Sequence, residues 1–196
     1  MAAGRKRLRV VSMRWLLTLF VVPIALCFIP AAMAAQDDPR LEGLFESLLQ
    51  PLEAEEARRV EVMIWQIWGE IDDPKIERLL DYGTRAMALG AYDRALIDFN
   101  AVVELAPEMA EAWNKRATLH YLMGNYPESI MDIERTLALE PRHFGALSGL
   151  GLINMALGRD EVALKAFEAA LEVNPHLPGP KANIEDIKRR LEGEAL

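Results

Sequence analysis

A period of 34 residues runs through the second half of the sequence and limits its fold more than any other feature. Residues of the same kind return at this interval in five separate columns. The columns are Pro107, Pro141 and Pro175; Gly90, Gly124 and Gly158; Gly83, Ala117 and Gly151; Ala95, Ser129 and Ala163; Phe99, Ile133 and Phe167. Self-similarity at a fixed period of this length indicates stacked copies of one supersecondary unit.

Each column has a physical role in a pair of helices. A glycine such as Gly90 ends the first helix, because it adopts a left-handed conformation without steric cost. A small residue inside that helix, such as Gly83, allows close approach of the second helix, where Ala95 makes room from the other side. A proline such as Pro107 stops the second helix, since it loses a hydrogen bond and clashes with the preceding turn. Antiparallel helix pairs, stacked side by side, are therefore expected.

The period and these columns closely resemble the tetratricopeptide repeat family, whose unit is 34 residues long. The resemblance covers residues 76–177 and implies three units, at 76–109, 110–143 and 144–177. The expected fold is all-α, an α-solenoid of antiparallel helix pairs.

Both ends of such a stack need covering elements. Residues 178–196 predict a capping helix with Ile184, Ile187 and Leu191 on one stripe. Residues 37–72 predict a degenerate helix pair that extends the stack, although it lacks the glycine and proline columns. Its second helix is apolar on two sides, which favours burial between neighbours. One side carries Val60, Ile64, Ile67 and Ile71, and the other carries Ala57, Trp65 and Trp68.

The N-terminal segment has the three parts of a secretory signal. Basic residues precede an apolar run at 15–29, and a small-residue exit follows with Ala32 and Ala34. We expect residues 1–34 to be removed by a cut after Ala34 and the protein to be exported, to a periplasm. The alternative is that residues 10–29 remain as an inner-membrane anchor facing the periplasm. The run is shorter than a bilayer span and contains Pro23, which favours cleavage.

Cleavage would make the mature chain strongly acidic. Five of the 22 basic residues and none of the 30 acidic ones lie before residue 35, so 17 basic residues remain and the net charge is −13. Phosphate binding depends on concentrated lysine and arginine, so nucleic acid is not an expected partner. A membrane is a partner only if the N-terminal segment is uncleaved.

The sequence offers no set of residues that predicts catalysis, a cofactor or a metal site. His120, His143 and His176 lie in different units without metal-binding spacing, and a structural or exposed role is favoured. The glycines from Gly145 to Gly151 lack the strand and lysine of a phosphate loop. We therefore expect a protein that is not an enzyme, and packing rather than ligand stacking for the two tryptophans at 65 and 68.

The resemblance implies a protein-binding groove lined by the first helix of each unit. The positions that correspond are Leu80, Thr84, Met87, Asn114, Lys115, Thr118, Tyr121, Ser148, Leu152 and Met155. One subgroup of the family holds acidic C-termini of heat-shock chaperones with several cations. Here the corresponding positions are Leu80, Thr84, Lys115, Gly145 and Gly149, with only one cation, so carboxylate capture is not expected.

These features together favour an exported, non-enzymatic adaptor or scaffold that binds a protein or peptide partner in the groove, and assists assembly of envelope or secretion machinery. They resemble small periplasmic repeat proteins of Gram-negative bacteria. A membrane-tethered assembly subunit is the second hypothesis, and an enzyme is the third.

Overall fold

The computed structural model describes residues 35–194, which form nine α-helices, one short 3-10 helix and no strand. The predicted all-α solenoid of helix pairs is confirmed. The 3-10 helix η1 spans Ala35–Asp37, and the α-helices are α1 (Arg40–Leu48), α2 (Ala54–Trp68), α3 (Pro74–Ala88), α4 (Tyr92–Leu105), α5 (Ala110–Leu122), α6 (Tyr126–Leu139), α7 (Phe144–Ala156), α8 (Asp160–Val173) and α9 (Pro178–Glu194).

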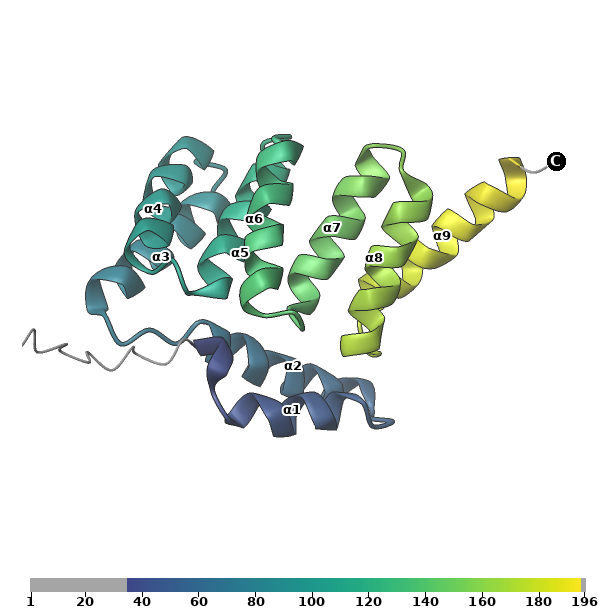
Figure 1. Ribbon diagram of the computed structural model, residues 1–196, viewed down its shortest axis with the longest axis horizontal. Helices are drawn as coiled ribbons and strands as arrows, with labels where there is room; N and C mark the ends of the chain where they lie inside the picture. Colours follow the sequence, from purple (N-terminus) through teal and green to yellow (C-terminus); the bar gives the residue numbers. More distant parts are fainter. Residues whose placement is uncertain (1–34, 195–196) are drawn as a thin grey trace, which may run out of the picture. The chain divides into compact units, whose positions relative to one another are not determined.

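Three helix pairs, α3/α4, α5/α6 and α7/α8, form the repeats (Figure 1). The turn inside each pair contains the predicted glycine in a left-handed conformation, with φ of 73° at Gly90, 76° at Gly124 and 68° at Gly158. In the first pair the Gly90 N–H donates to the Met87 carbonyl at 3.0 Å and the Ala91 N–H to the Ala86 carbonyl at 2.9 Å. These two hydrogen bonds satisfy the last carbonyl groups of the helix.

The small residues inside the first helices make room for large side chains of the second helices, such as Phe99 and Phe167. A Cβ added at Gly83 would lie 2.7 Å from the Phe99 ring, and one at Gly151 would lie 2.4 Å from the Phe167 ring. The middle unit has alanine at this position, Ala117, and carries the smaller Ile133 where the outer units have phenylalanine. In each unit the size of the first-helix residue is therefore matched to the size of its neighbour on the second helix, and the crossing of the two helices is fully packed.

At the C-terminal end, α9 packs against α8. Its stripe of Ile184, Ile187 and Leu191 joins the cluster around Phe167. Arg190 forms an ion pair with Asp160 at the start of α8, at 2.8 Å.

The N-terminal pair α1/α2 does not extend the stack, and this part of the prediction is wrong. Figure 1 shows α1 and α2 lying across the ends of α5 to α8, on the side where one unit joins the next. Their apolar residues form one buried cluster with residues of α7, α8 and the last inter-repeat loop. The members are Leu41, Phe45, Leu48, Val60, Ile64, Ile67, Trp68, Phe144, Ala170 and Leu177.

Residues 36–50 contact the three inter-repeat loops one after another, in the order in which the loops follow in the chain. Gln36 donates from Nε2 to the Glu108 carbonyl at 2.7 Å. Glu42 accepts from Arg142 at 2.9 Å. The Gln50 carbonyl lies 3.0 Å from Nε2 of His176. Gln36 lies in η1, Glu42 in α1 and Gln50 just after α1, so the contacts follow the chain from one loop to the next. The N-terminal pair thereby braces all three units.

Candidate functional site

The predicted groove residues lie on three neighbouring helices. Leu80, Thr84 and Met87 are on α3, four residues are on α5, and Ser148, Leu152 and Met155 are on α7. The first helices of the units contact one another, since α5 packs against both α3 and α7. The α5 members are Asn114, Lys115, Thr118 and Tyr121.

The threonine and serine hydroxyl groups of this surface are bonded within their own helices. Thr84 donates to the Leu80 carbonyl at 2.7 Å, and Thr118 donates to the Asn114 carbonyl at 2.9 Å. Ser148 donates to the Phe144 carbonyl at 2.7 Å. Each hydroxyl has thereby used its single hydrogen, and only its lone pairs remain for another molecule.

Asn114 lies inside the protein rather than on the groove surface, with 8% of it exposed. Its side-chain amide donates to Oε2 of Glu111 at 2.8 Å. The same carboxylate is 3.1 Å from Nε2 of His143, and its other oxygen is 3.2 Å from Nζ of Lys115. The only cation of the predicted groove is thus paired with a buried acid.

This buried carboxylate is held in its charged form. Burial by itself raises the pKa of Glu111, but the hydrogen bond from His143, the charge of Lys115 and the hydrogen bond from Asn114 outweigh burial and lower the pKa. The Ala146 N–H donates to Nδ1 of His143 at 3.1 Å, so the other ring nitrogen, Nε2, carries the proton that faces Glu111. The predicted structural role of His143 is confirmed, because it caps α7 and is fully buried.

The apolar groove residues are partly used in packing. Leu152 and Met155 pack against the buried cluster of Ala163, Phe167 and Ile187. Leu80 and Met87 pack against the cluster around Phe99. The Tyr121 ring lies 5.9 Å from that of Tyr126, centroid to centroid.

One exposed apolar residue of this surface escaped the sequence analysis. Leu122 follows Thr118 by one helical turn on α5, and 46% of it is exposed. The positions one period away are Ala88 and Ala156, so the repeat columns predict nothing special there. Thr118 is exposed as well, and the two residues form the most open part of the predicted groove.

The two tryptophans of α2 pack on the start of α7. The Trp68 ring stacks on His143 at 4.1 Å with an interplanar angle of 10°. Trp65 meets Phe144 edge to face at 5.2 Å. A Cβ added at Gly145 would lie 2.5 Å from Trp65, so the absence of a side chain at 145 makes room for the indole. The preference for packing over ligand stacking is confirmed.

Two of the positions that correspond to a carboxylate clamp are already used inside the protein. Lys115 is paired with Glu111, and Gly145 lies under Trp65.

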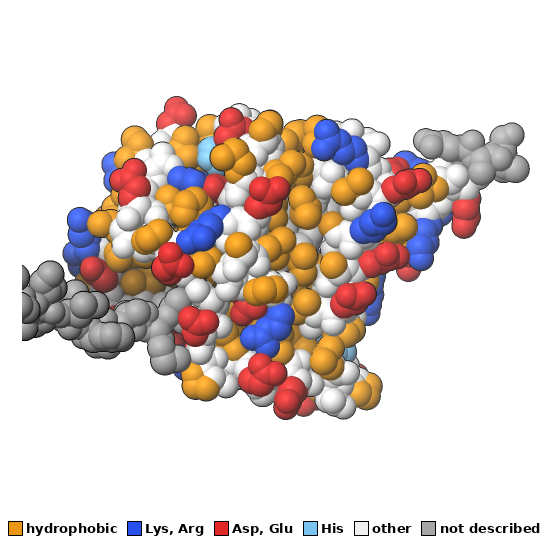
Figure 2. Space-filling view, viewed as in Figure 1, with side chains coloured by type: hydrophobic (Ala, Val, Ile, Leu, Met, Phe, Trp, Pro, Cys, Tyr) orange, Lys and Arg blue, Asp and Glu red, His pale blue; other side chains and the backbone are white. Residues whose placement is uncertain are grey.

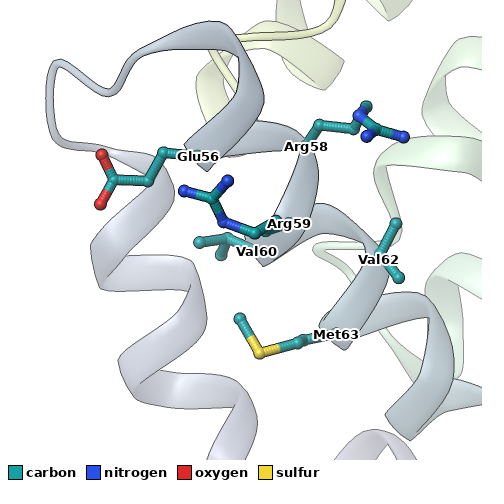
Figure 3. A pocket seen from close by; sticks show the side chains of 6 residues that line it. All are labelled: Glu56, Arg58, Arg59, Val60, Val62 and Met63. Atoms are coloured by element: carbon teal, nitrogen blue, oxygen red, sulfur yellow. The ribbon is translucent and has the colours of Figure 1, made fainter.

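A hollow of about 530 Å³ lies on the surface of α2 (Figure 3). Two of the side chains that line it, Arg58 and Val62, point to one side of α2. The other four point to the opposite side, as their helical spacing requires: Glu56, Arg59, Val60 and Met63. All six residues come from one helix. Arg58 and Arg59 both face Glu55, at 2.9 and 3.8 Å, so the hollow has no concentrated charge.

Two further features were sought within residues 35–194. No group of three or more His, Cys, Asp or Glu residues there could hold a metal ion. No helix there has the length and hydropathy needed to cross a membrane. The predicted signal segment, 1–34, lies outside the described residues.

The face seen in Figure 2 mixes acidic, basic and hydrophobic side chains, without a large patch of one charge sign. Charge alone therefore does not mark a site on that face.

The helix pairs, their glycine turns and the adjacent first helices define an α-solenoid of repeated helical hairpins. The tetratricopeptide repeat family matches residues 80–135 and 117–178. The chain belongs to this family.

Relatives and solved structures agree with this assignment. A TPR repeat-containing protein of Rhizobium etli is 38% identical over 136 residues, which are 69% of this chain and 67% of that protein. The small glutamine-rich tetratricopeptide repeat-containing protein 2 of Saccharomyces cerevisiae is 27% identical over 70% of this chain, but only 40% of its own length is matched. The first repeat domain of RPAP3, solved with the HSP90 peptide SRMEEVD, has a TM-score of 0.58 and 23% identity, over 62% of this chain and 97% of that domain.

Proposed function

We propose that this protein is a non-enzymatic adaptor that binds a segment of another protein in the groove formed by α3, α5 and α7. The observation that carries the proposal is the open centre of this surface, where Thr118 and Leu122 are exposed between two other first helices. Exposed apolar area next to hydroxyl groups is a common composition of protein interfaces. The fold agrees, since the RPAP3 domain that shares it holds a peptide of another protein.

The brace formed by α1 and α2 also supports binding of a partner in the groove. A repeat stack whose units are held in register offers a preformed surface, which lowers the ordering cost of binding. Gln36, Glu42 and Gln50 each contact a different inter-repeat loop and so limit movement of one unit against the next.

The export part of the proposal rests on the sequence of residues 1–34. A basic start, an apolar run and a small-residue exit support secretion and a role in envelope or secretion assembly. A tethered assembly subunit is favoured instead if the apolar run is retained. N-terminal sequencing of the protein made in its host separates the two, because release predicts Ala35 as the first residue and tethering predicts an intact N-terminal segment.

Site-specific photo-crosslinking tests the groove. A photoreactive amino acid is placed at Thr118, and as a matched control at Met131 of α6, which is 68% exposed and lies on a second helix. We expect a discrete crosslinked partner from position 118 in the native envelope and none from position 131. The same partner at both positions, or only at 131, would contradict the groove as the site.

A further inference from the structure

We propose that the N-terminal pair α1/α2 controls the charge that the groove offers to a partner. While the pair is docked on the repeats, Glu111 holds Lys115, and release of the pair frees Lys115. The inference rests on the proposed function and adds a form of regulation to it. It follows from a continuous series of contacts that runs from Trp68 of α2 through His143 to Glu111 and Lys115.

The outer end of this series is the contact between α2 and His143. The Trp68 ring lies almost parallel to the imidazole at 4.1 Å and covers one of its faces. Trp65 approaches the same ring at 5.4 Å, with an interplanar angle of 76°. Neither tryptophan belongs to the repeats, and His143 is fully buried. The N-terminal pair is therefore part of the cover that keeps water away from this histidine.

The inner end of the series lies at the groove. Nε2 of His143 is 3.1 Å from Oε2 of Glu111, and Nζ of Lys115 is 3.2 Å from Oε1. The Glu111 side chain is 3% exposed, whereas that of Lys115 is 30% exposed. An ion pair to a buried acid is strong because water does not screen it, and the same pair holds weakly once it is solvated. Access of water to His143 and Glu111 therefore loosens the hold on Lys115.

The polar ties between the N-terminal pair and the repeats are weak, and α1 and α2 pack on each other, so the pair can leave as one body. The ion pair of Glu42 with Arg142 is exposed to solvent, where such pairs contribute little. The hydrogen bond between His176 and the Gln50 carbonyl is exposed as well. The buried indole N–H of Trp68 has no hydrogen-bond partner among the described residues, and undocking returns it to water.

The coupling acts in both directions, as linked equilibria require. A partner that draws Lys115 away leaves Glu111 with less compensation for its buried charge, which is costly. Water reduces this cost when the N-terminal pair undocks. A segment bound at Lys115 therefore weakens the docking of α1/α2, and docking of α1/α2 weakens binding at Lys115.

Lysine acetylation followed by peptide mass spectrometry tests the forward coupling on the protein purified from its host. An amine that is held by a buried acid reacts more slowly than one that is free in solvent. The acetylation of Lys115 is therefore measured relative to that of exposed lysines in the same sample. These references are Lys75, Lys165, Lys181 and Lys188.

Two variants loosen the N-terminal pair at buried residues, Trp68→Ala on α2 and Leu48→Ala on α1. Glu111→Gln removes the charge that holds Lys115 and shows the full effect. Two controls accompany them. Met63→Ala truncates a residue of α2 that is 42% exposed, and Gly151→Ala destabilises the repeats at the crossing of α7 and α8. Hydrogen exchange on the same samples reports whether α1/α2 is released and whether α5 stays folded.

We expect the relative acetylation of Lys115 to rise about threefold or more in Trp68→Ala, Leu48→Ala and Glu111→Gln, and to stay unchanged in both controls. An unchanged Lys115 in both pair variants overturns the inference. It does so if α1/α2 is released, because the pair then does not control Lys115, and also if α1/α2 stays docked, because the pair is then not releasable. An equal rise in Gly151→Ala overturns it as a general loosening of the fold. Loss of α5 protection in both pair variants overturns it too, because pair and repeats then unfold together.

Hydrogen exchange also tests the reverse coupling. Lys115→Met should speed exchange of the α1 and α2 amides about threefold or more, and the control Lys165→Met should not. Unchanged exchange in Lys115→Met overturns the inference. None of these measurements contains a partner, so their failure leaves groove binding to the crosslinking test at Thr118. A failed crosslink there removes the proposed function but leaves the coupling itself in place.

Discussion

The N-terminal helix pair and the three repeat pairs are made of the same elements but are joined to the molecule in different ways. Within a repeat pair, small residues such as Gly83 and Gly151 let the two helices touch. The pair α1/α2 has large aromatic residues instead, and Trp68 reaches into the joint between two units. Small residues at a regular interval close the helix pairs that stack in series, whereas a helix with two apolar sides braces the stack from outside.

The largest effect that tests this comparison is expected from Trp68→Ala. Trp68 is 1% exposed and contacts Phe45, His143 and Phe144. Its loss should lower the free energy of unfolding by about 3–5 kcal/mol through cavity formation. Hydrogen exchange should show that amides of α1 and α2 lose protection first, while those of α3 to α8 keep most of theirs. Uniform loss across all helices would show that brace and stack are one unit.

Two matched variants control this experiment. Trp68→Phe removes an indole N–H that has no hydrogen-bond partner among the described residues, so it should cost much less than the alanine variant. Met63→Ala truncates a residue of the same helix that is partly exposed, and should also have a small effect.

On the stack side, Gly151→Ala should lower the free energy of unfolding by about 1–3 kcal/mol, because a Cβ there meets the Phe167 ring at 2.4 Å. Combining it with Phe167→Ile recreates the pair found in the middle unit, Ala117 with Ile133. In chemical denaturation the double variant should cost less than the sum of the two single variants. Simple additivity would mean that these two positions are not matched to each other.

The turns of the stack provide a smaller test. Gly124→Ala should cost about 1 kcal/mol, because the φ of 76° is unfavourable for a residue with a Cβ. Gly43→Ala is the control, since Gly43 lies within α1 with no heavy atom near its added Cβ. That substitution should stabilise the protein by up to about 1 kcal/mol in thermal melts. Equal effects of the two would argue against the left-handed turn.

The smallest effect concerns Glu111, whose partner His143 is the residue on which Trp68 of the N-terminal pair stacks. The pKa of Glu111 is lowered in the folded protein, so its contribution to stability is present at neutral pH and is lost as the pH falls below about 4.5, the ordinary value, through the lowered pKa. Denaturation between pH 6 and pH 3 should show a shallower fall in stability for Glu111→Gln than for the native protein. Parallel curves would mean that this carboxyl is not held ionised by its neighbours.

Much of the stack was predictable because each residue column acts within one or two turns. The left-handed Gly90, Gly124 and Gly158 and the stripe of α9 follow from local steric rules and helical spacing. The position of α1/α2 was not predictable in this way. Its two apolar sides indicate burial, but they do not say which surface covers them.

The candidate groove shows the same division. Its residues lie on the three adjacent first helices, as the repeat register predicts. The burial of Asn114 and the pairing of Lys115 depend on Glu111 and His143, which lie 32 residues apart at the two ends of the second unit. The exposure of Leu122 has no counterpart in the repeat columns.

The sequence by itself determined the helices, their turns and their pairing, because the 34-residue columns encode backbone conformation and close helix contact locally. Only the tertiary structure decided where the N-terminal pair lies and which polar groups of the groove remain free. Both depend on contacts between residues far apart in the chain, such as Trp68 with His143, and a periodic pattern carries no information on how its units meet an element outside the repeat.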